Sequence, residues 1–305
     1  MSYRKDLKIS KLYREFLASL DKNTSSAHLS YDDLVKLFHE ILAEGIYGLG
    51  FSLYEEGQKP GDHITEEQVR RRMNILKPHI KAIRSFSCIE GNEFIPRIAK
   101  EFGLKTLVGA WIGDDLDKNK QEITALIKLA NEGYVDIAAV GNEVLYRNDI
   151  PKEELMQYMD EVRAAIPKEI PVTYVDAYYE FSVHPDLTEK CDVILVNCYP
   201  FWESCPIEYS LQHMQQMYGQ ALSAAKGKKV IISETGWPSQ GENLGAAQPS
   251  AENFLKYFIN TQLWCKQANI ECYYFSSFDE AWKVGSEGDV GAYWGLWKSD
   301  ERFKF

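Results

Sequence analysis

A regular alternation of apolar, strand-like segments and amphipathic, helix-like segments runs through most of this 305-residue chain. Eight short segments are almost continuously apolar, a pattern typical of parallel strands that are covered on both faces. These predicted strands are 45–53, 82–87, 105–112, 135–143, 171–178, 192–200, 229–238 and 270–279. The predicted helices between them are 66–80, 93–102, 120–132, 152–166, 184–190, 207–225 and 251–267.

Repeated strand–helix units predict an α/β fold in which the strands close into a (β/α)8 barrel, or TIM barrel. An open, doubly wound sheet is the alternative. However, the segment that could cradle a dinucleotide, Gly45–Gly50, has its glycines in the wrong order and lies within a strand. No linker rich in Pro, Gly or Ser divides the chain. We therefore expect a single catalytic domain over residues 1–305, with residues 1–42 as an N-terminal helical extension.

Charge and composition exclude some partners. The net charge of −11 argues against nucleic acid or an anionic membrane, because binding to phosphate needs clustered Lys and Arg. The first ten residues lack the apolar stretch of a signal peptide, so the chain as written predicts a cytoplasmic protein, or an exported one if a leader was removed. The six cysteines have no CxxC spacing and are expected to be reduced. The oligomeric state stays open.

Polar residues close four of the predicted strands. In (β/α)8 enzymes the catalytic residues lie at the carboxyl ends of the strands. The polar ends here are Gly141-Asn142-Glu143, Asn197-Cys198-Tyr199-Pro200, Ser233-Glu234-Thr235-Gly236-Trp237-Pro238 and Phe278-Asp279-Glu280. Since these ends meet at one mouth of a barrel, we expect their side chains to lie close together.

Two of these residues are carboxylates, Glu143 and Glu234, and a buried carboxylate without a partner costs several kcal/mol. One explanation is an ion pair with a base such as Arg84 or Lys283. The other is catalysis, because glycoside cleavage uses one carboxylic acid as proton donor and a second, ionised carboxylate. In enzymes that retain the anomeric configuration the two groups stand about 5 Å apart. A pair on two strands of one barrel favours catalysis.

The segments Gly141-Asn142-Glu143 and Glu234–Ser239 resemble the two signatures of family 17 glycoside hydrolases, which are β-1,3-glucanases and glucanosyltransferases with (β/α)8 barrels. The resemblance extends from about Gly45 to Trp297. Within it, FSLYEEGQKPG, NCYPFWE and GAYWGLW are more similar to bacterial than to plant members. The resemblance implies that Glu143 is the acid/base and Glu234 the nucleophile, and that no metal or organic cofactor takes part.

The same resemblance suggests the residues that bind substrate. Asn142 is similar to an asparagine that binds the sugar 2-hydroxyl, and Tyr199 to a tyrosine that holds the nucleophile in its ionised form. Further expected substrate-binding residues are Phe201, Trp202, Trp237, Glu280, Trp282 and Lys283, with the four aromatic ones as sugar-stacking candidates. One departure is Ser276, which stands where relatives commonly carry a glutamate near the sugar cleft.

The leading hypothesis is therefore endo-type, retaining hydrolysis of β-1,3-glucosidic bonds in laminarin-type β-glucan. A β-1,3-glucan transglycosylase, in which a sugar hydroxyl replaces water, would use the same two glutamates and is the nearest alternative. A non-catalytic glucan-binding barrel is a distant one, since both glutamates are present. A phosphate-handling barrel would need a glycine-rich cradle after the last strands, and Gly241–Gly245 brings an acid there instead.

Overall fold

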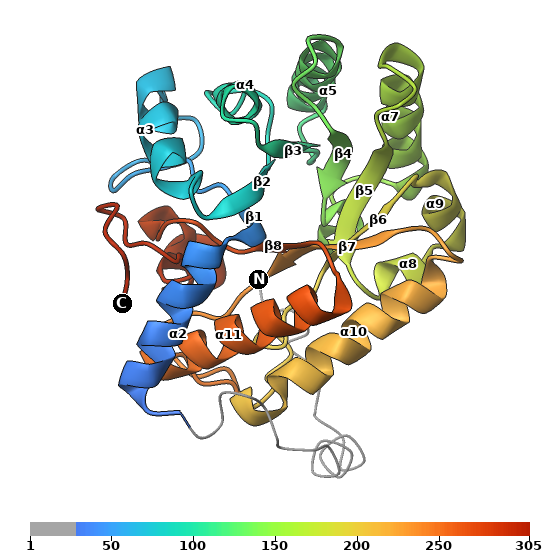
Figure 1. The fold of residues 1–305 in the computed structure, drawn as a ribbon. Helices are drawn as coiled ribbons and strands as arrows, with labels where there is room; N and C mark the ends of the chain where they lie inside the picture. The colour runs from blue at the N-terminus through green and yellow to red at the C-terminus, as the bar shows by residue number, and fades with distance from the viewer. Residues whose placement is uncertain (1–28) are drawn as a thin grey trace.

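The computed structural model of the protein describes residues 29–305 and confirms the (β/α)8 barrel (Figure 1). Each strand pairs in parallel with the next, and β8 closes the barrel against β1, which excludes the open sheet. The strands are β1 (Ile46–Gly50), β2 (Ile80–Ser85), β3 (Lys105–Ala110), β4 (Ile137–Asn142), β5 (Val172–Ala177), β6 (Ile194–Asn197), β7 (Val230–Thr235) and β8 (Cys272–Tyr274).

Helices surround the barrel and match the predicted segments to within a few residues. The longer ones are α3 (Glu66–Leu76), α4 (Phe94–Glu101), α5 (Leu116–Asn131), α7 (Lys152–Ala165), α9 (Pro185–Lys190), α10 (Ser210–Ala224) and α11 (Ala251–Ala268). The structure adds short elements that the sequence pattern did not predict, namely α6 (Val144–Arg147), α8 (Glu180–Val183), α12 (Val284–Glu287) and the 3-10 turns η2 (Ala281–Lys283) and η3 (Asp289–Ala292). A third 3-10 turn, η1 (Ile207–Tyr209), forms the first turn of the predicted helix 207–225. No helix within residues 29–305 is long and apolar enough to cross a membrane.

Helix α2 (Tyr31–Glu44) covers the end of the predicted N-terminal extension, 1–42, and continues two residues beyond it. Its N-cap is Ser30, whose hydroxyl accepts a hydrogen bond from the Asp33 backbone N–H. Figure 1 shows α2 beside α11, and the rings of Phe38 and Phe258 pack there with their centroids 4.9 Å apart. Residues 1–28 of the predicted extension lie outside the described residues, so its full extent stays a prediction.

One side chain from each of seven strands fills the barrel interior. These buried residues are Ala82, Leu107, Ala139, Val175, Leu195, Ile231 and Tyr273. Because side chains alternate along a strand, the residue two positions further on faces the same way, one layer nearer to the carboxyl end. On β2 and β6 that residue is polar, Arg84 above Ala82 and Asn197 above Leu195. The interior therefore changes from apolar to polar as it reaches the mouth.

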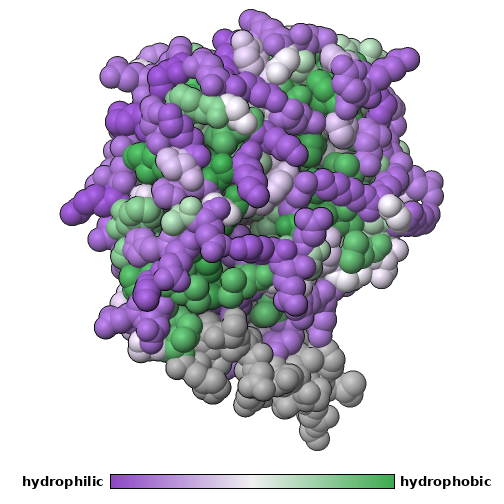
Figure 2. Space-filling view, viewed as in Figure 1, coloured by the Kyte–Doolittle hydropathy of each residue, from purple (hydrophilic) through white to green (hydrophobic). Residues whose placement is uncertain are grey.

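The last strand is shorter than predicted, since β8 ends at Tyr274 and not at Asp279. The following residues leave the barrel and hydrogen-bond with the segment 294–297, as in the bond from the Ser276 N–H to the Trp294 carbonyl. Gly236 lets β7 approach this bend, since a Cβ atom there would lie 2.2 Å from the Phe275 carbonyl oxygen. The outer surface is mostly hydrophilic on the face that Figure 2 shows, and all six cysteines are buried as free thiols.

Candidate active site

Two glutamates from opposite sides of the barrel meet at its carboxyl end. Glu143 follows β4, Glu234 lies in β7, and Asn197 at the end of β6 contacts both. The Asn197 Nδ2 atom lies 2.8 Å from Glu143 Oε1 and 3.2 Å from Glu234 Oε1. Because one nitrogen reaches both oxygens, they are within about 6 Å of each other, close to the ~5 Å typical of retaining glycosidases. Inverting enzymes need a wider gap to hold a water molecule between the carboxyl groups.

The orientation of the Asn197 amide is set by Ser233. The Ser233 hydroxyl donates to Asn197 Oδ1 over 2.8 Å, so the amide nitrogen is the end that faces the two glutamates. Both residues are fully buried. The contact that spaces the carboxyl groups is therefore part of a rigid network in the mouth of the barrel.

A buried arginine pairs with one of the glutamates. Arg84 Nη1 lies 2.8 Å from Glu234 Oε1 and also donates to the Ser233 carbonyl oxygen at 2.7 Å. Its Nη2 donates to Asn142 Oδ1 at 2.8 Å, which leaves the Asn142 amide nitrogen to donate elsewhere. The ion pair considered for Arg84 is thus present, and it orients Glu234 without occupying both of its oxygens.

The second oxygen of Glu234 is held by Tyr199. The Tyr199 hydroxyl donates to Glu234 Oε2 over 2.8 Å. Burial, and then the negative charge of Glu234, raises the pKa of Tyr199 well above its ordinary value. The phenol therefore stays protonated and remains a donor, as an attacking carboxylate requires.

The backbone at the end of β4 explains the sequence Gly-Asn-Glu. Gly141 has φ of +85°, and a Cβ atom there would lie 2.7 Å from a methyl carbon of Val144. Glu143 is also left-handed, with φ of 54° and ψ of 30°. Such a conformation costs about 1–3 kcal/mol in a residue other than glycine and persists where the surroundings impose it. Here the Glu143 N–H donates to the Val175 carbonyl at 2.8 Å.

A second buried acid lies below Glu143. Asp176, on β5, is fully buried and accepts hydrogen bonds from the Ala177 N–H at 2.7 Å and from the Tyr174 hydroxyl. Burial, and then the charge of Glu143, raises the pKa of Asp176 well above its ordinary value. The Tyr174 hydroxyl in turn accepts from the Leu145 N–H at 2.9 Å. This network supports the turn that carries Glu143.

Three of the predicted stacking residues form an aromatic cluster beside Tyr199. Phe201 packs against Trp202 and Trp237 with ring centroids 5.3 Å apart in both cases, and Trp202 lies 5.4 Å from Trp294. Phe201 and Trp237 are fully buried, so the stacking predicted for these two rings does not fit the structure. Both are covered by other rings, and the Trp237 Nε1–H donates to the Gln248 carbonyl at 3.0 Å. Trp202 is 9% exposed and borders the cluster.

The other three predicted binding residues lie together beyond β8. Lys283 Nζ is 2.7 Å from Glu280 Oε2, and Glu280 Oε1 accepts from the Tyr54 N–H at 3.2 Å. Trp282 is half-buried, with its ring 5.6 Å from that of Tyr54. Lys283 therefore pairs with Glu280 and not with either catalytic candidate. Ser276, expected beside a sugar subsite, is buried, and its hydroxyl donates to the Phe278 carbonyl at 3.2 Å.

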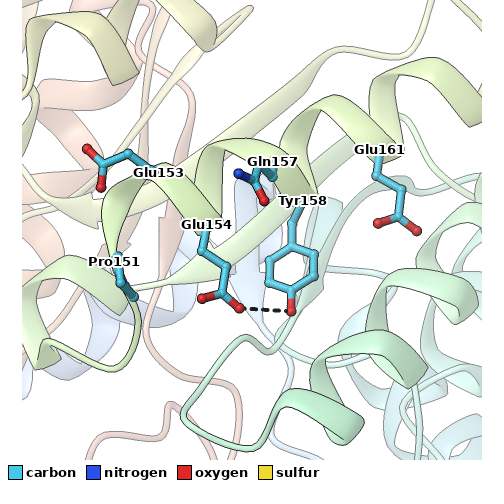
Figure 3. A pocket seen from close by; sticks show the side chains of 6 residues that line it. All are labelled: Pro151, Glu153, Glu154, Gln157, Tyr158 and Glu161. Carbon is cyan, nitrogen blue, oxygen red and sulfur yellow. Dashed lines mark hydrogen bonds between the residues drawn. The ribbon is translucent and has the colours of Figure 1, made fainter.

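A separate hollow lies on the outer side of α7 and has a polar lining (Figure 3). Its lining residues are Pro151, Glu153, Glu154, Gln157, Tyr158 and Glu161. Neither Glu143 nor Glu234 lines it, so it does not belong to the barrel mouth. Within residues 29–305, no group of three or more His, Cys, Asp or Glu side chains is arranged to hold a metal ion.

Asn197 and Arg84 were not among the predicted site residues. Asn197 carried a usable signal, because it is the polar residue that closes an apolar strand. Arg84 stands inside an apolar strand, where a charged side chain also needs a partner. The motif Gly-Asn-Glu and the strand β7 therefore supply the two glutamates. Asn197 and Arg84, which were not predicted, hold them in place.

A (β/α)8 barrel with two closely spaced glutamates at its carboxyl end is the architecture of a glycoside hydrolase. Residues 48–295 match the model of the BtgE/BtgC glycoside hydrolase domain. A family 17 β-1,3-glucanosyltransferase from Rhizomucor miehei has a structure that superimposes with a TM-score of 0.77 at 31% identity, over 86% of this chain and 96% of that one. The chain belongs to glycoside hydrolase family 17, as its two signatures predicted.

Two further comparisons bear on the substrate. The glucan 1,3-beta-glucosidase of Arthroderma benhamiae is 29% identical over 84% of this chain and 89% of its own length. An active-site mutant of the Rhizomucor miehei enzyme, solved in complex with laminaritriose, is 30% identical with a TM-score of 0.77, over 86% of this chain and 96% of that one.

Proposed function

We propose that this protein cleaves β-1,3-glucosidic bonds of laminarin-type β-glucan with retention of the anomeric configuration. Glu234 is the nucleophile and Glu143 the acid/base. The observation that carries this proposal is the shared contact of Asn197, which keeps the two carboxyl groups at the short separation of retaining enzymes.

In the first step, an oxygen of Glu234 attacks the anomeric carbon and forms an ester bond to the sugar. The bond from that carbon to the leaving oxygen breaks, and the Glu143 carboxyl proton passes to the leaving oxygen. Arg84 and Tyr199 each hold one oxygen of Glu234, which fixes the carboxylate before the attack. In this proposal the Asn142 amide nitrogen donates to the sugar hydroxyl beside the reacting carbon, which is consistent with its Oδ1 accepting from Arg84.

In the second step, Glu143 acts as the base. Its carboxylate takes a proton from water, the water oxygen attacks the anomeric carbon, and the ester bond to Glu234 breaks. Both glutamates return to their starting protonation states. The two inversions at one carbon give the retained configuration.

The proposed substrate rests on the relatives and on the charge of the protein. The relatives named above are a glucan 1,3-beta-glucosidase and a β-1,3-glucanosyltransferase, one of them seen with laminaritriose. A neutral glucan also suits a protein with a net charge of −11, since it carries no phosphate or carboxylate to repel.

Transglycosylation is the second candidate, and the similarity to the Rhizomucor miehei transferase favours it. It differs only in the last step, where a sugar hydroxyl takes the place of water. Products from laminari-oligosaccharides, measured with and without excess acceptor, separate the two: short products alone mean hydrolysis, and products longer than the substrate mean transfer.

Proton NMR of the first product tests the retaining mechanism in the same reaction. We expect the β anomer to appear first and to equilibrate slowly with the α anomer. An α anomer as the first product would contradict the retaining mechanism. If the Glu234→Gln variant reacts as fast as the wild type, the assignment of Glu234 as the nucleophile is wrong.

A further inference from the structure

Trp111 is an exposed aromatic residue that the proposed mechanism does not use. It directly follows β3, at the carboxyl end of the barrel, and its side chain is 37% exposed. The predicted stacking residues Phe201 and Trp237, by contrast, are fully buried. Trp111 therefore offers a ring surface that those two residues do not.

The alternation of side chains along β3 indicates that Trp111, which directly follows this strand, lies over the barrel interior. Leu107 belongs to the interior layer, and side chains that are an even number of positions apart lie on the same side of a strand. Trp111 comes four residues after Leu107, one residue beyond the end of β3, so the same alternation directs its side chain inward. We therefore expect the indole to stand at the rim of the mouth that contains the two glutamates.

Arg147 fixes the indole from behind. The centre of its guanidinium group lies 4.5 Å from the centroid of the Trp111 ring, which is a cation–π contact. Arg147 is itself held by Asp149 at 2.7 Å and by the Ile112 carbonyl oxygen at 3.3 Å. Because one face of the ring rests on a pinned side chain, the exposed part is turned away from Arg147 and is rigid.

The same arginine is connected to the acid/base. Arg147 ends the short helix α6 that begins directly after Glu143, and its backbone N–H donates to the Glu143 carbonyl oxygen at 2.9 Å, as in a regular helical turn. An acid that protonates the leaving oxygen must stand on the side of the leaving sugar, opposite to the nucleophile. Strand β3 pairs with β4, so Trp111 lies on the Glu143 side and away from Glu234 in β7.

We propose that Trp111, backed by Arg147, is a binding platform for the glucosyl unit on the leaving-group side of the scissile bond. This inference rests on the proposed function and extends it to a specificity-determining residue. The apolar face of a pyranose ring packs on the exposed part of the indole, much as other amphipathic groups pack on aromatic rings. The rigid backing reduces the entropy that is lost when the sugar is ordered.

The platform would also receive the acceptor in transglycosylation. After the leaving sugar departs, an acceptor sugar occupies the same place, gives its hydroxyl proton to Glu143 and attacks the anomeric carbon through its oxygen. The bond to Glu234 then breaks, and a new glucosidic bond remains. Occupancy of the Trp111 platform therefore favours transfer over hydrolysis.

The test compares two substrates that both present β-1,3-linked glucosyl units to the nucleophile and differ in the leaving group. Laminaripentaose leaves a sugar on the platform, whereas β-laminaribiosyl fluoride leaves only fluoride. For Trp111→Ala we expect kcat/KM on laminaripentaose to fall about tenfold, the scale of one aromatic contact. On the fluoride it should stay within about twofold of wild type, and Trp111→Phe should keep most of the activity on both.

Tyr31→Ala is the matched control, because Tyr31 is an exposed aromatic residue on α2, at 45% exposure. This variant should keep the wild-type kcat/KM on both substrates. The melting temperatures of all variants should show that the fold is kept. Equal losses on both substrates, or no loss on laminaripentaose for Trp111→Ala, would overturn the platform while the proposed function stands. If the wild type acts on neither substrate, the proposed function fails, and the platform that rests on it fails too.

Discussion

The Tyr199 hydroxyl donates a hydrogen bond to Glu234 Oε2 over 2.8 Å, in a part of the barrel mouth where both side chains are almost completely buried. Arg84 occupies the other oxygen of the same carboxylate at 2.8 Å. A buried carboxylate whose two oxygens both accept hydrogen bonds is positioned before substrate arrives, which is how a rigid site lowers the barrier of an attack.

Replacement of Tyr199 by Phe should therefore slow catalysis without removing it. A hydrogen bond to a charged group contributes about 1.5–3 kcal/mol, so we expect kcat/KM on laminari-oligosaccharides to fall by roughly one to two orders of magnitude. Tyr257→Phe is the control, because the Tyr257 hydroxyl is also buried but contacts Thr235 and not Glu234. If both variants lose the same activity, the effect comes from packing and not from the bond to Glu234.

Glu234→Gln should abolish turnover while binding survives. Glutamine keeps the shape of the side chain but lacks the negative oxygen that attacks the anomeric carbon. We expect hydrolysis of laminari-oligosaccharides to fall by several orders of magnitude, and calorimetry to show that the variant still binds them. Activity within about tenfold of wild type, a difference of only ~1.4 kcal/mol, would exclude Glu234 from the covalent step.

Glu143→Ala should affect substrates according to their leaving groups. A natural glucan needs a proton on its leaving oxygen, whereas a substrate with an activated leaving group does not. We expect a severe loss on laminarin, a smaller loss on a dinitrophenyl glycoside, and rescue of that second reaction by azide, which needs no base to attack the intermediate. Equal losses on the two substrates, with no effect of azide, would show that Glu143 is not the acid/base.

Glu122 should make the stability of the protein depend on pH. This α5 side chain is fully buried and accepts hydrogen bonds from the Ser87 hydroxyl and from the Cys88 N–H at 2.7 Å. Burial raises the pKa of Glu122 to about 7 from a value of 4.5. A raised pKa in the folded state means that the native protein binds the proton more tightly than the unfolded chain does.

The resulting stabilisation is complete below pH 4.5 and is lost as the pH rises towards 7. Between these two pH values, Glu122 alone lowers the free energy of unfolding by about 3 kcal/mol. Glu122→Gln cannot ionise, so denaturant unfolding of this variant should show a smaller decrease of stability between these pH values. Glu153→Gln, on the exposed side of α7, is the control and should keep the slope of the wild type. A Glu122→Gln variant with an unchanged slope would contradict the assignment.

The sequence by itself determined the order of the strands and helices and the two glutamates of the site. Those features are local: the spacing of apolar residues follows the period of each element, and Glu143 and Glu234 stand in short motifs at strand ends. Even the glycine before Asn142 has a local reason, because Gly141 takes a left-handed backbone conformation. The short helix α6 was missed because four residues are too few to show a period.

The exposure and partners of the remaining side chains were decided only by the tertiary structure. Phe201 and Trp237 were predicted from the sequence as sugar-stacking residues, yet the ring cluster around Trp294 covers them. Lys283 could have paired with a catalytic glutamate but pairs with Glu280. These outcomes depend on contacts between residues that are distant in the chain, which a periodic pattern does not encode.

The spacing of the two carboxyl groups also belongs to the tertiary structure. It is set by Asn197 from β6, which reaches glutamates on β4 and β7, and by Arg84 from β2. Closure of the barrel brings these four strands to a common mouth, and the stagger of each strand decides which side chain stands at its rim. The residues were readable in the sequence, whereas their distances exist only once the sheet has closed.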